Sequence, residues 1–245
     1  MDYNKSIAYA IEILKINPKD IWRIKNINIQ IKPLDKIPTN IQDKIKNLIT
    51  KYKYFYNLYS NQFPDTIDAL LMIYDHMGAL DNVALSITPD KKKLWREKYN
   101  ATHELFGAFF NTDPQNTYCS RFAELEKPRA TCNALTFIPE IGKTYIVNPP
   151  YDEFFINWTL FNIIYNWTES SFIIVIPDWR LKIRKKYGLK SDFKEMNSIN
   201  DIIEYCDKKK YKYIEYAPKK YNFYNGMTHS IYSLNTAILE IYILR

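Results

Sequence analysis

The stretch TYIVNPPYDEFFINWTLFNIIYNWTESSFIIVIP, residues 144–177, decides the fold of this 245-residue chain. It holds two short runs rich in β-branched and aromatic residues, TYIV at 144–147 and SFIIVIP at 171–177, and a turn residue ends each run. The segment between them has apolar residues at helical spacing. A strand–helix–strand unit of this kind joins two parallel strands, so the stretch predicts an α/β fold.

The rest of the chain predicts two parts. Apolar residues at helical spacing predict helices over residues 3–16, over residues 41–59 and after Pro64, so residues 1–100 are expected to be a mostly helical region. The second part has short apolar runs separated by Pro, Asn and Asp, and NTAILEIYIL near the C-terminus predicts a last strand with YKYIEY as its partner. We expect residues 101–245 to form an α/β domain.

Composition and charge indicate a globular protein with an acidic partner. A hydrophobic fraction of 47% and a charged fraction of 25% argue against disorder. The net charge of +7 at pH 7 suits nucleic acid as the partner. Three cysteines without a CxxC pair predict no disulfide framework and no metal site. Because the chain shows no signal peptide and no apolar window of about 18 residues, we expect an intracellular protein, in cytoplasm or nucleus, of cellular or viral origin.

The carboxyl ends of the two parallel strands are the expected place for a functional site. Ligands of open α/β sheets lie beyond these ends. The first strand runs into NPPY at 148–151 and the second into DWR at 178–180, and the strand–helix–strand order makes the two ends neighbours. The residues after the second strand are Asp178, Trp179 and Arg180. They either form an ordinary polar end of a strand or contact the substrate.

The residues Asn148, Pro149, Pro150 and Tyr151 follow a predicted strand and resemble the [DNS]PP[YF] signature of methyltransferases that modify exocyclic amines, above all N6 of adenine. Such an amine is a poor nucleophile because its lone pair is delocalised into the ring. Asn148 Oδ1 and the carbonyl oxygen of Pro149 can each accept one N6–H bond, which frees the lone pair to point at a methyl sulfonium. The prolines keep both acceptors aimed, and Tyr151 offers a flat face to a flipped base. The alternative is a plain turn that starts with Asn-Pro.

Five motifs occur in order along the second part of the chain, namely Tyr118–Phe122, Tyr145–Tyr151, Phe172–Arg180, Tyr224–His229 and Leu234–Leu239. This series resembles the catalytic module, without a WW domain, of the phosphorylated-CTD-interacting-factor (WW-domain-type) methyltransferases over about residues 101–243. Members of that family transfer a methyl group from S-adenosylmethionine to N6 of the 2′-O-methylated adenosine next to an mRNA cap. The resemblance implies that residues 101–245 form a Rossmann-like class I methyltransferase domain, with S-adenosylmethionine as cofactor and capped mRNA as partner.

The resemblance also implies a set of cofactor-binding residues. FGAFFN at 106–111 matches the cofactor-side loop of the family, and acidic residues farther along would bind the ribose hydroxyls. Phe109 stands where the family usually has Pro, and AELEKPRATCN at 123–133 lacks the glycine of the family's acidic stretch. The cofactor-binding candidates are Phe106, Gly107, Asn111, Glu124, Glu126 and Asn148.

On the substrate side, Asn148 to Tyr151 would hold the adenine, and His229 after Gly226 could face the site, although a lone histidine is more often structural. No strong base is expected, since the N6 proton becomes acidic once the methyl group is attached. Three basic runs with aromatic residues are either solvated surfaces or RNA contacts, and they cover 90–99, 180–190 and 208–224. The substrate-binding candidates are Tyr151, Asp178, Trp179, Arg180 and His229.

Two other functions stay open at the level of sequence. The same NPPY chemistry would serve a DNA adenine N6-methyltransferase. The altered AELEKPRATCN stretch would also fit an inactive subunit that keeps the fold in order to bind RNA or a protein partner.

Overall fold

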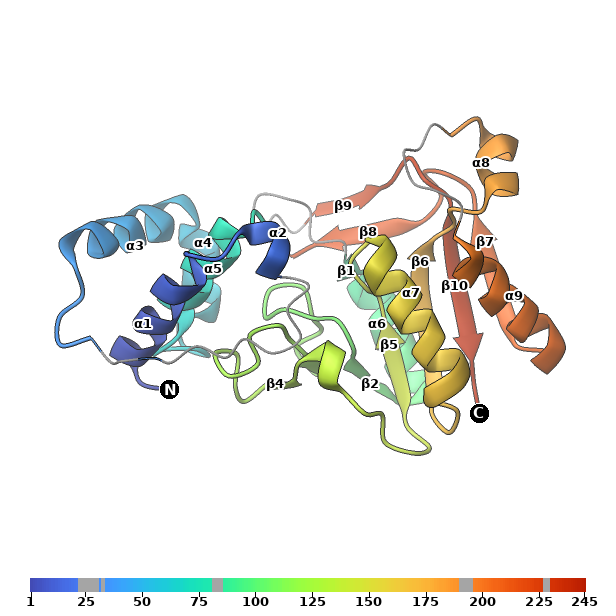
Figure 1. Cartoon of the computed structure of the whole chain (residues 1–245), viewed down its shortest axis with the longest axis horizontal. Helices are drawn as coiled ribbons and strands as arrows, with labels where there is room; N and C mark the ends of the chain where they lie inside the picture. The colour runs from blue at the N-terminus through green and yellow to red at the C-terminus, as the bar shows by residue number, and fades with distance from the viewer. Residues whose placement is uncertain (22–30, 32–33, 81–85, 190–195, 227–229) are drawn as a thin grey trace. The chain divides into compact units, whose positions relative to one another are not determined.

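The computed structural model describes residues 1–21, 31, 34–80, 86–189, 196–226 and 230–245 (Figure 1). The chain divides into two compact units. The first comprises Met1–Ala84 and Ser120–Thr136, and the second comprises Leu85–Cys119 and Phe137–Arg245. The predicted division into a helical region, 1–100, and a Rossmann-like domain, 101–245, stays a prediction.

Helices make up most of the first unit. The helix α5 is buried from Ile67 to Tyr74, and α1 and α3 pack against it. The predicted helices are confirmed, although the second breaks at Tyr52, whose φ of −112° and ψ of 33° leave the helical region. The elements of this unit are α1 (Tyr3–Ile13), α2 (Pro18–Ile21), α3 (Thr39–Lys51), α4 (Lys53–Tyr59), α5 (Ile67–His76), β4 (Ala130–Cys132) and η1 (Ala134–Thr136).

The predicted strand–helix–strand unit is confirmed in the second unit. The strand β5 (Thr144–Val147) leads into α7 (Glu153–Phe161), which continues into a short π-helical segment, η2 (Asn162–Asn166). The chain then returns as β6 (Ser171–Pro177), and the two strands are parallel, with Thr144 opposite Ser171 and Val147 opposite Ile174. This arrangement confirms the α/β class and is compatible with a Rossmann-like fold.

The strand β6 forms the centre of the second unit because every one of its residues is buried. Its side chains alternate between two hydrophobic clusters, as the pleat of a strand requires. Phe172, Ile174 and Ile176 join the cluster that contains α7 and α9, and these two helices cover that face of the sheet (Figure 1). Ile173 and Val175 join the other cluster, which contains Trp95 of α6, Tyr221 and Phe223.

The strands of the second unit follow the order β3-β2-β5-β6-β10-β7. The first four are parallel to one another, and β10 runs antiparallel to both β6 and β7, which confirms the predicted pairing of the last strand with YKYIEY. A separate antiparallel sheet has the order β1-β8-β9. The further elements of this unit are β1 (Ser86–Ile87), α6 (Pro89–Tyr99), β2 (Ala101–Glu104), β3 (Thr117–Cys119), α8 (Leu181–Tyr187), α9 (Asn197–Lys209), β7 (Lys212–Tyr216), β8 (Asn222–Asn225), β9 (Ser230–Ser233) and β10 (Ile238–Ile243).

His103 in β2 is a partly buried structural histidine. Its Nδ1 lies 2.7 Å from Thr117 Oγ1, its Nε2 lies 3.3 Å from Cys119 Sγ, and its ring stacks on Phe137 with 5.3 Å between ring centroids. Burial, together with the nearby Lys143 ammonium, lowers the pKa of His103 from 6.5 to about 4. Between pH 6.5 and about pH 4, the His103 imidazole is therefore mostly neutral in the folded protein but mostly protonated in the unfolded chain.

We expect His103→Gln to reduce the acid sensitivity of the protein. The contribution of neutral His103 to stability is fully present above pH 6.5 and is lost as the pH falls to about 4, because only the unfolded state is protonated in this window. The loss for one such group approaches about 3 kcal/mol. Urea unfolding at several pH values measures it, and identical pH dependence in the wild-type protein and the variant would contradict the assignment.

Candidate active site at the carboxyl ends of the strands

The strand order reverses between β2 and β5. The chain places β3 on one side of β2 and then returns to place β5 on the other side. In open α/β sheets the ligand crevice lies beyond the carboxyl ends of the strands at such a reversal. The segments that follow β2 and β5 are Leu105–Asn111 and Asn148–Tyr151, so the predicted cofactor-side loop and the NPPY sequence border the same point of the sheet.

The NPPY segment forms a corner between β5 and α7. The Tyr151 hydroxyl donates a hydrogen bond to Asn148 Oδ1 at 3.4 Å. Asp152 closes the corner, since its N–H donates to the Pro150 carbonyl oxygen at 2.8 Å and its side chain caps α7 by accepting from the Phe154 N–H at 2.9 Å. Local contacts therefore hold the Asn148 carboxamide at the carboxyl end of β5.

The Tyr151 ring is partly buried and is held by aromatic packing. It lies nearly perpendicular to the ring of Phe223 in β8, with 6.2 Å between the ring centroids. Burial raises the pKa of the Tyr151 phenol well above its usual range, and the neighbouring Tyr232 adds to the shift. The phenol is therefore neutral at physiological pH and keeps the proton that it donates to Asn148.

Backbone N–H groups of the loop after β2 make two hydrogen bonds that fix its shape. The Gly107 N–H donates to the Cys119 carbonyl oxygen at 2.9 Å, and the Ala108 N–H donates to Asn111 Oδ1 at 2.8 Å. The Phe106 ring lies 6.2 Å from that of Phe155 in α7, the helix that follows the NPPY corner. The structure therefore brings Phe106, Gly107 and Asn111 to the strand end next to Asn148.

Asp178 and Arg180 at the end of β6 are paired with each other. Both are buried, and the guanidinium binds the carboxylate in a bidentate manner, with Nε 2.8 Å from Oδ1 and Nη2 2.7 Å from Oδ2. Arg180 also pairs with Glu215 of β7. Burial alone would lower the pKa of Arg180, but the hydrogen bonds to Asp178 and Glu215 outweigh it and raise the pKa. Trp179 is buried as well, and a substrate-contacting role for all three residues stays a prediction.

The two predicted ribose-binding acids lie in the first unit and differ in their surroundings. Glu124 is exposed and forms an ion pair with Lys127 at 2.8 Å. Glu126 is fully buried, and its Oε1 accepts hydrogen bonds from the Tyr74 hydroxyl at 2.5 Å and the Ser120 hydroxyl at 2.6 Å. Their cofactor-binding role stays a prediction. His229 lies outside the described residues.

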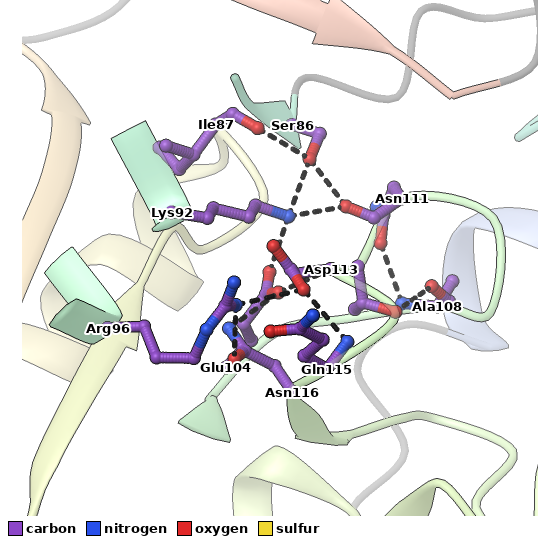
Figure 2. Close-up of polar contacts among 11 residues, drawn as sticks. Ser86, Ile87, Lys92, Arg96, Glu104, Ala108, Asn111, Asp113, Gln115 and Asn116 are labelled. Atoms are coloured by element: carbon purple, nitrogen blue, oxygen red, sulfur yellow. Dashed lines mark hydrogen bonds and ion pairs between the residues drawn. The ribbon is translucent and has the colours of Figure 1, made fainter. Parts of the chain in front are cut away.

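Figure 2 shows a network of polar contacts between α6, the end of β2 and the loop after β2, which the sequence patterns did not predict. Lys92 of α6 and Glu104 at the end of β2 form an ion pair at 2.7 Å and are almost fully buried. Two signals in the sequence could have pointed to this network. Lys92 lies three residues before the apolar Trp95, on the same face of the helix, and Glu104 lies two residues before Phe106, where FGAFFN begins.

Two further observations concern the part of the chain that the structure describes. There, no helix has the length and apolar character needed to cross a membrane. Within the same residues, no group of three or more His, Cys, Asp or Glu side chains is placed to hold a metal ion.

We expect Gly107→Ala to destabilise the loop after β2. A Cβ atom at this position would lie 2.4 Å from Thr112 Cγ2 and 2.9 Å from Tyr118 Cβ. Overpacking of this kind costs about 1–3 kcal/mol, which thermal unfolding measures. Adding Thr112→Ser removes the nearest atom and should recover part of the loss, so equal destabilisation of the single and double variants would contradict the steric explanation.

Comparison with known protein families assigns the chain to one of them. The family described as phosphorylated CTD interacting factor 1 WW domain matches residues 44–214, and a comparison with curated proteins finds no match. The matched range contains the loop after β2, the NPPY corner and the end of β6. It begins upstream of the predicted range, 101–243, and ends before the motif at 224–229. The chain belongs to the phosphorylated CTD interacting factor 1 family.

Proposed function

We propose that this protein is an S-adenosylmethionine-dependent RNA methyltransferase that acts on N6 of adenosine, at the nucleotide next to an mRNA cap. Membership in the family suggests this activity at the level of the family. The observation that carries the proposal for this chain is the position of Asn148–Tyr151 at the carboxyl end of β5, beside the reversal of strand order. This is the place where an α/β sheet binds its ligand.

The proposed role of the corner is to hold and orient the adenine. Asn148 Oδ1 and the Pro149 carbonyl oxygen accept the two N6–H bonds, so the nitrogen lone pair turns out of the ring plane. Because Asn148 Oδ1 already accepts a hydrogen bond from the neutral Tyr151 phenol, its direction is set before the base arrives. The Tyr151 ring, packed against Phe223, provides the surface on which the base lies.

The loop after β2 fits the methyl donor. It stands at the reversal of strand order, and Phe106 places a partly buried aromatic ring there for an adenosyl group. Asn111 shapes the loop by accepting from the Ala108 N–H. S-adenosylmethionine, when bound, supplies a methyl group on an electrophilic sulfonium. The chain itself needs no strong base, because methylation makes the N6 proton acidic and both acceptor oxygens can hold it until water removes it.

Asn148→Ala tests the role of the corner. We expect kcat to fall by about 100-fold or more, in line with the removal of a group aimed at the reacting centre, while the affinity for S-adenosylhomocysteine stays within about twofold. The matched control is Asn157→Ala, an exposed asparagine of α7, which should keep wild-type turnover. Near-normal turnover of the Asn148 variant would refute the assigned role.

A substrate panel separates the proposed function from its two alternatives. Labelled S-adenosylmethionine is supplied with capped RNA that starts in A, 2′-O-methyl-A or G, with uncapped RNA and with DNA. Transfer to capped RNA that starts in adenosine supports the proposal. Transfer only to DNA would identify a DNA adenine methyltransferase. If calorimetry detects no binding of S-adenosylhomocysteine, the result would instead favour an inactive subunit that binds RNA or a protein partner.

The helix α8 is the part of the second unit that we propose for RNA backbone contact. It begins at Leu181, shortly after the end of β6 at Pro177. Its lysines Lys182, Lys185 and Lys186 and the ring of Tyr187 are exposed. Exposed cations beside an aromatic ring suit phosphate contact combined with base stacking. The net charge of +7 favours the same kind of partner.

Replacing these three lysines with glutamine should weaken RNA binding and flatten its dependence on salt. Each lost phosphate contact lowers the slope of log K against log salt by about 0.7 for a single strand. The charge-matched control replaces Lys5, Lys15 and Lys19, exposed lysines of the first unit, and should change the slope less. Fluorescence anisotropy between 50 and 300 mM salt (roughly the range in which such slopes are resolved) measures both. Equal slopes for the three proteins would contradict the assignment.

A further inference from the structure

The loop after β2 contains a single glycine, and side chains of neighbouring elements hold it in place. The chain has only five glycines, and Gly107 is the one within Leu105–Asn116. Loops that receive a nucleotide-like ligand at this place in an α/β sheet commonly rely on several glycines for close backbone approach. Here charged side chains from α6 and β2 hold the loop instead (Figure 2).

Lys92 is the centre of this arrangement. Its side chain is 3% exposed, and Nζ lies 2.9 Å from Ser86 Oγ, 2.7 Å from the Asn111 carbonyl oxygen and 2.7 Å from Glu104 Oε2. An ammonium group has three N–H donors, and these three acceptors match them. The Ser86 hydroxyl also donates to the Asn111 carbonyl oxygen, so two side chains fix the same backbone atom of the loop.

Glu104 connects the start of the loop to its end. Its Oε2 binds Lys92, while its Oε1 accepts from the Asp113 N–H at 2.8 Å and from Asn116 Nδ2 at 3.3 Å. The carboxylate therefore joins the helix α6, the last residue of β2 and the far end of the loop. A displacement of any of them would leave a charge unpaired in the interior, which is strongly unfavourable.

Arg96 provides a second attachment from the same helix. It lies four residues after Lys92, and its Nη1 is 2.9 Å from Asp113 Oδ1 and 3.3 Å from Asn116 Oδ1. Asp113 Oδ1 also accepts from the Gln115 N–H at 2.8 Å. Lys92 and Arg96 thus hold the middle and the end of the loop.

The backbone at the end of β8 approaches the loop closely. A Cβ atom on Gly226 would lie 1.7 Å from the Phe110 carbonyl oxygen and 3.5 Å from Asn111 Cα. The loop therefore has tight backbone packing at Phe110 and Asn111, in addition to the ion pairs of α6.

We propose that Lys92 is a positioning residue for the methyl donor. Through its pair with Glu104 it keeps the Asn111 carbonyl oxygen, and with it the loop Phe106–Asn111, in the shape that receives S-adenosylmethionine. Buried ion pairs contribute little net stability compared with apolar packing of the same volume, but they restrict geometry. This inference rests on the proposed function, because it assigns the cofactor to this loop.

The double variant Lys92→Met/Glu104→Gln tests the inference. It removes both charges together, so no unpaired charge is left in the interior, and the glutamine keeps an oxygen for the Asp113 N–H. We expect a folded protein whose affinity for S-adenosylhomocysteine falls by about tenfold, because the loop is no longer preorganised. The KM for S-adenosylmethionine should rise by the same factor, while kcat at saturation and the KM for RNA stay near their wild-type values. Amide hydrogen exchange of Ala108 and Asn111 should become faster.

The neighbouring pair Lys91 and Glu240 provides the matched control. Lys91 is the preceding residue of α6, and it forms an ion pair with Glu240, a buried residue of β10. Lys91→Met/Glu240→Gln removes one positive charge from the same helix and one buried negative charge from a strand, as the Lys92 double variant does, but neither residue belongs to the loop. We expect this variant to keep wild-type affinity for S-adenosylhomocysteine and wild-type exchange of the loop amides.

Each result has a distinct meaning. Equal affinity and equal loop exchange in the Lys92 double variant and the wild-type protein would overturn the role of Lys92 and leave the proposed function standing. Equal losses in the Lys92 and Lys91 double variants would also overturn it, because they would show a general effect on stability. If the wild-type protein itself does not bind S-adenosylhomocysteine, the proposed function falls, and the role of Lys92 falls with it.

Discussion

The burial of β6 on both faces is the constraint on which the second unit depends. Phe172, Ile174 and Ile176 pack on one side and Ile173 and Val175 on the other, so a shift of one residue would exchange the two clusters. The pairing of β5 with β6 and of β10 with β6 follows from this register. The NPPY corner has a defined position because the strand before it is fixed in this way.

Around this apolar centre, buried ion pairs fix the geometry of the strand ends. Lys92 pairs with Glu104 after β2, and Arg180 pairs with Asp178 after β6. The cost of desolvation offsets much of the Coulombic energy of such a pair, but separating its partners would leave an unpaired buried charge, so the pair restricts movement. The region where we place the site thus combines a hydrophobic interior with rigid polar edges, a combination that suits a reaction dependent on the direction of two acceptor oxygens.

Local patterns predicted the parts of the structure that are local. The unit β5-α7-β6 and the NPPY corner follow from strand signals, helical spacing and turn residues within 34 positions of the chain. The buried ion pairs of α6 could not be predicted in this way, because Lys91 and Lys92 pair with residues of other elements, Glu240 in β10 and Glu104 in β2. Lys91, Lys92 and Lys93 are identical letters in a basic run, yet the first pairs with Glu240, the second is buried against Glu104 and the third is exposed near Glu97. Only the packing of α6 on the sheet distinguishes them.

The helix α6 also determines where the chain can be divided. A fragment that starts at residue 101 would retain Glu104, Asp113 and Glu240, all of them buried, and would discard Lys91, Lys92 and Arg96, which neutralise them. The three carboxylates would then lack the cations that they bind in the full chain. We therefore expect a fragment of the second unit to fold more stably when it includes α6.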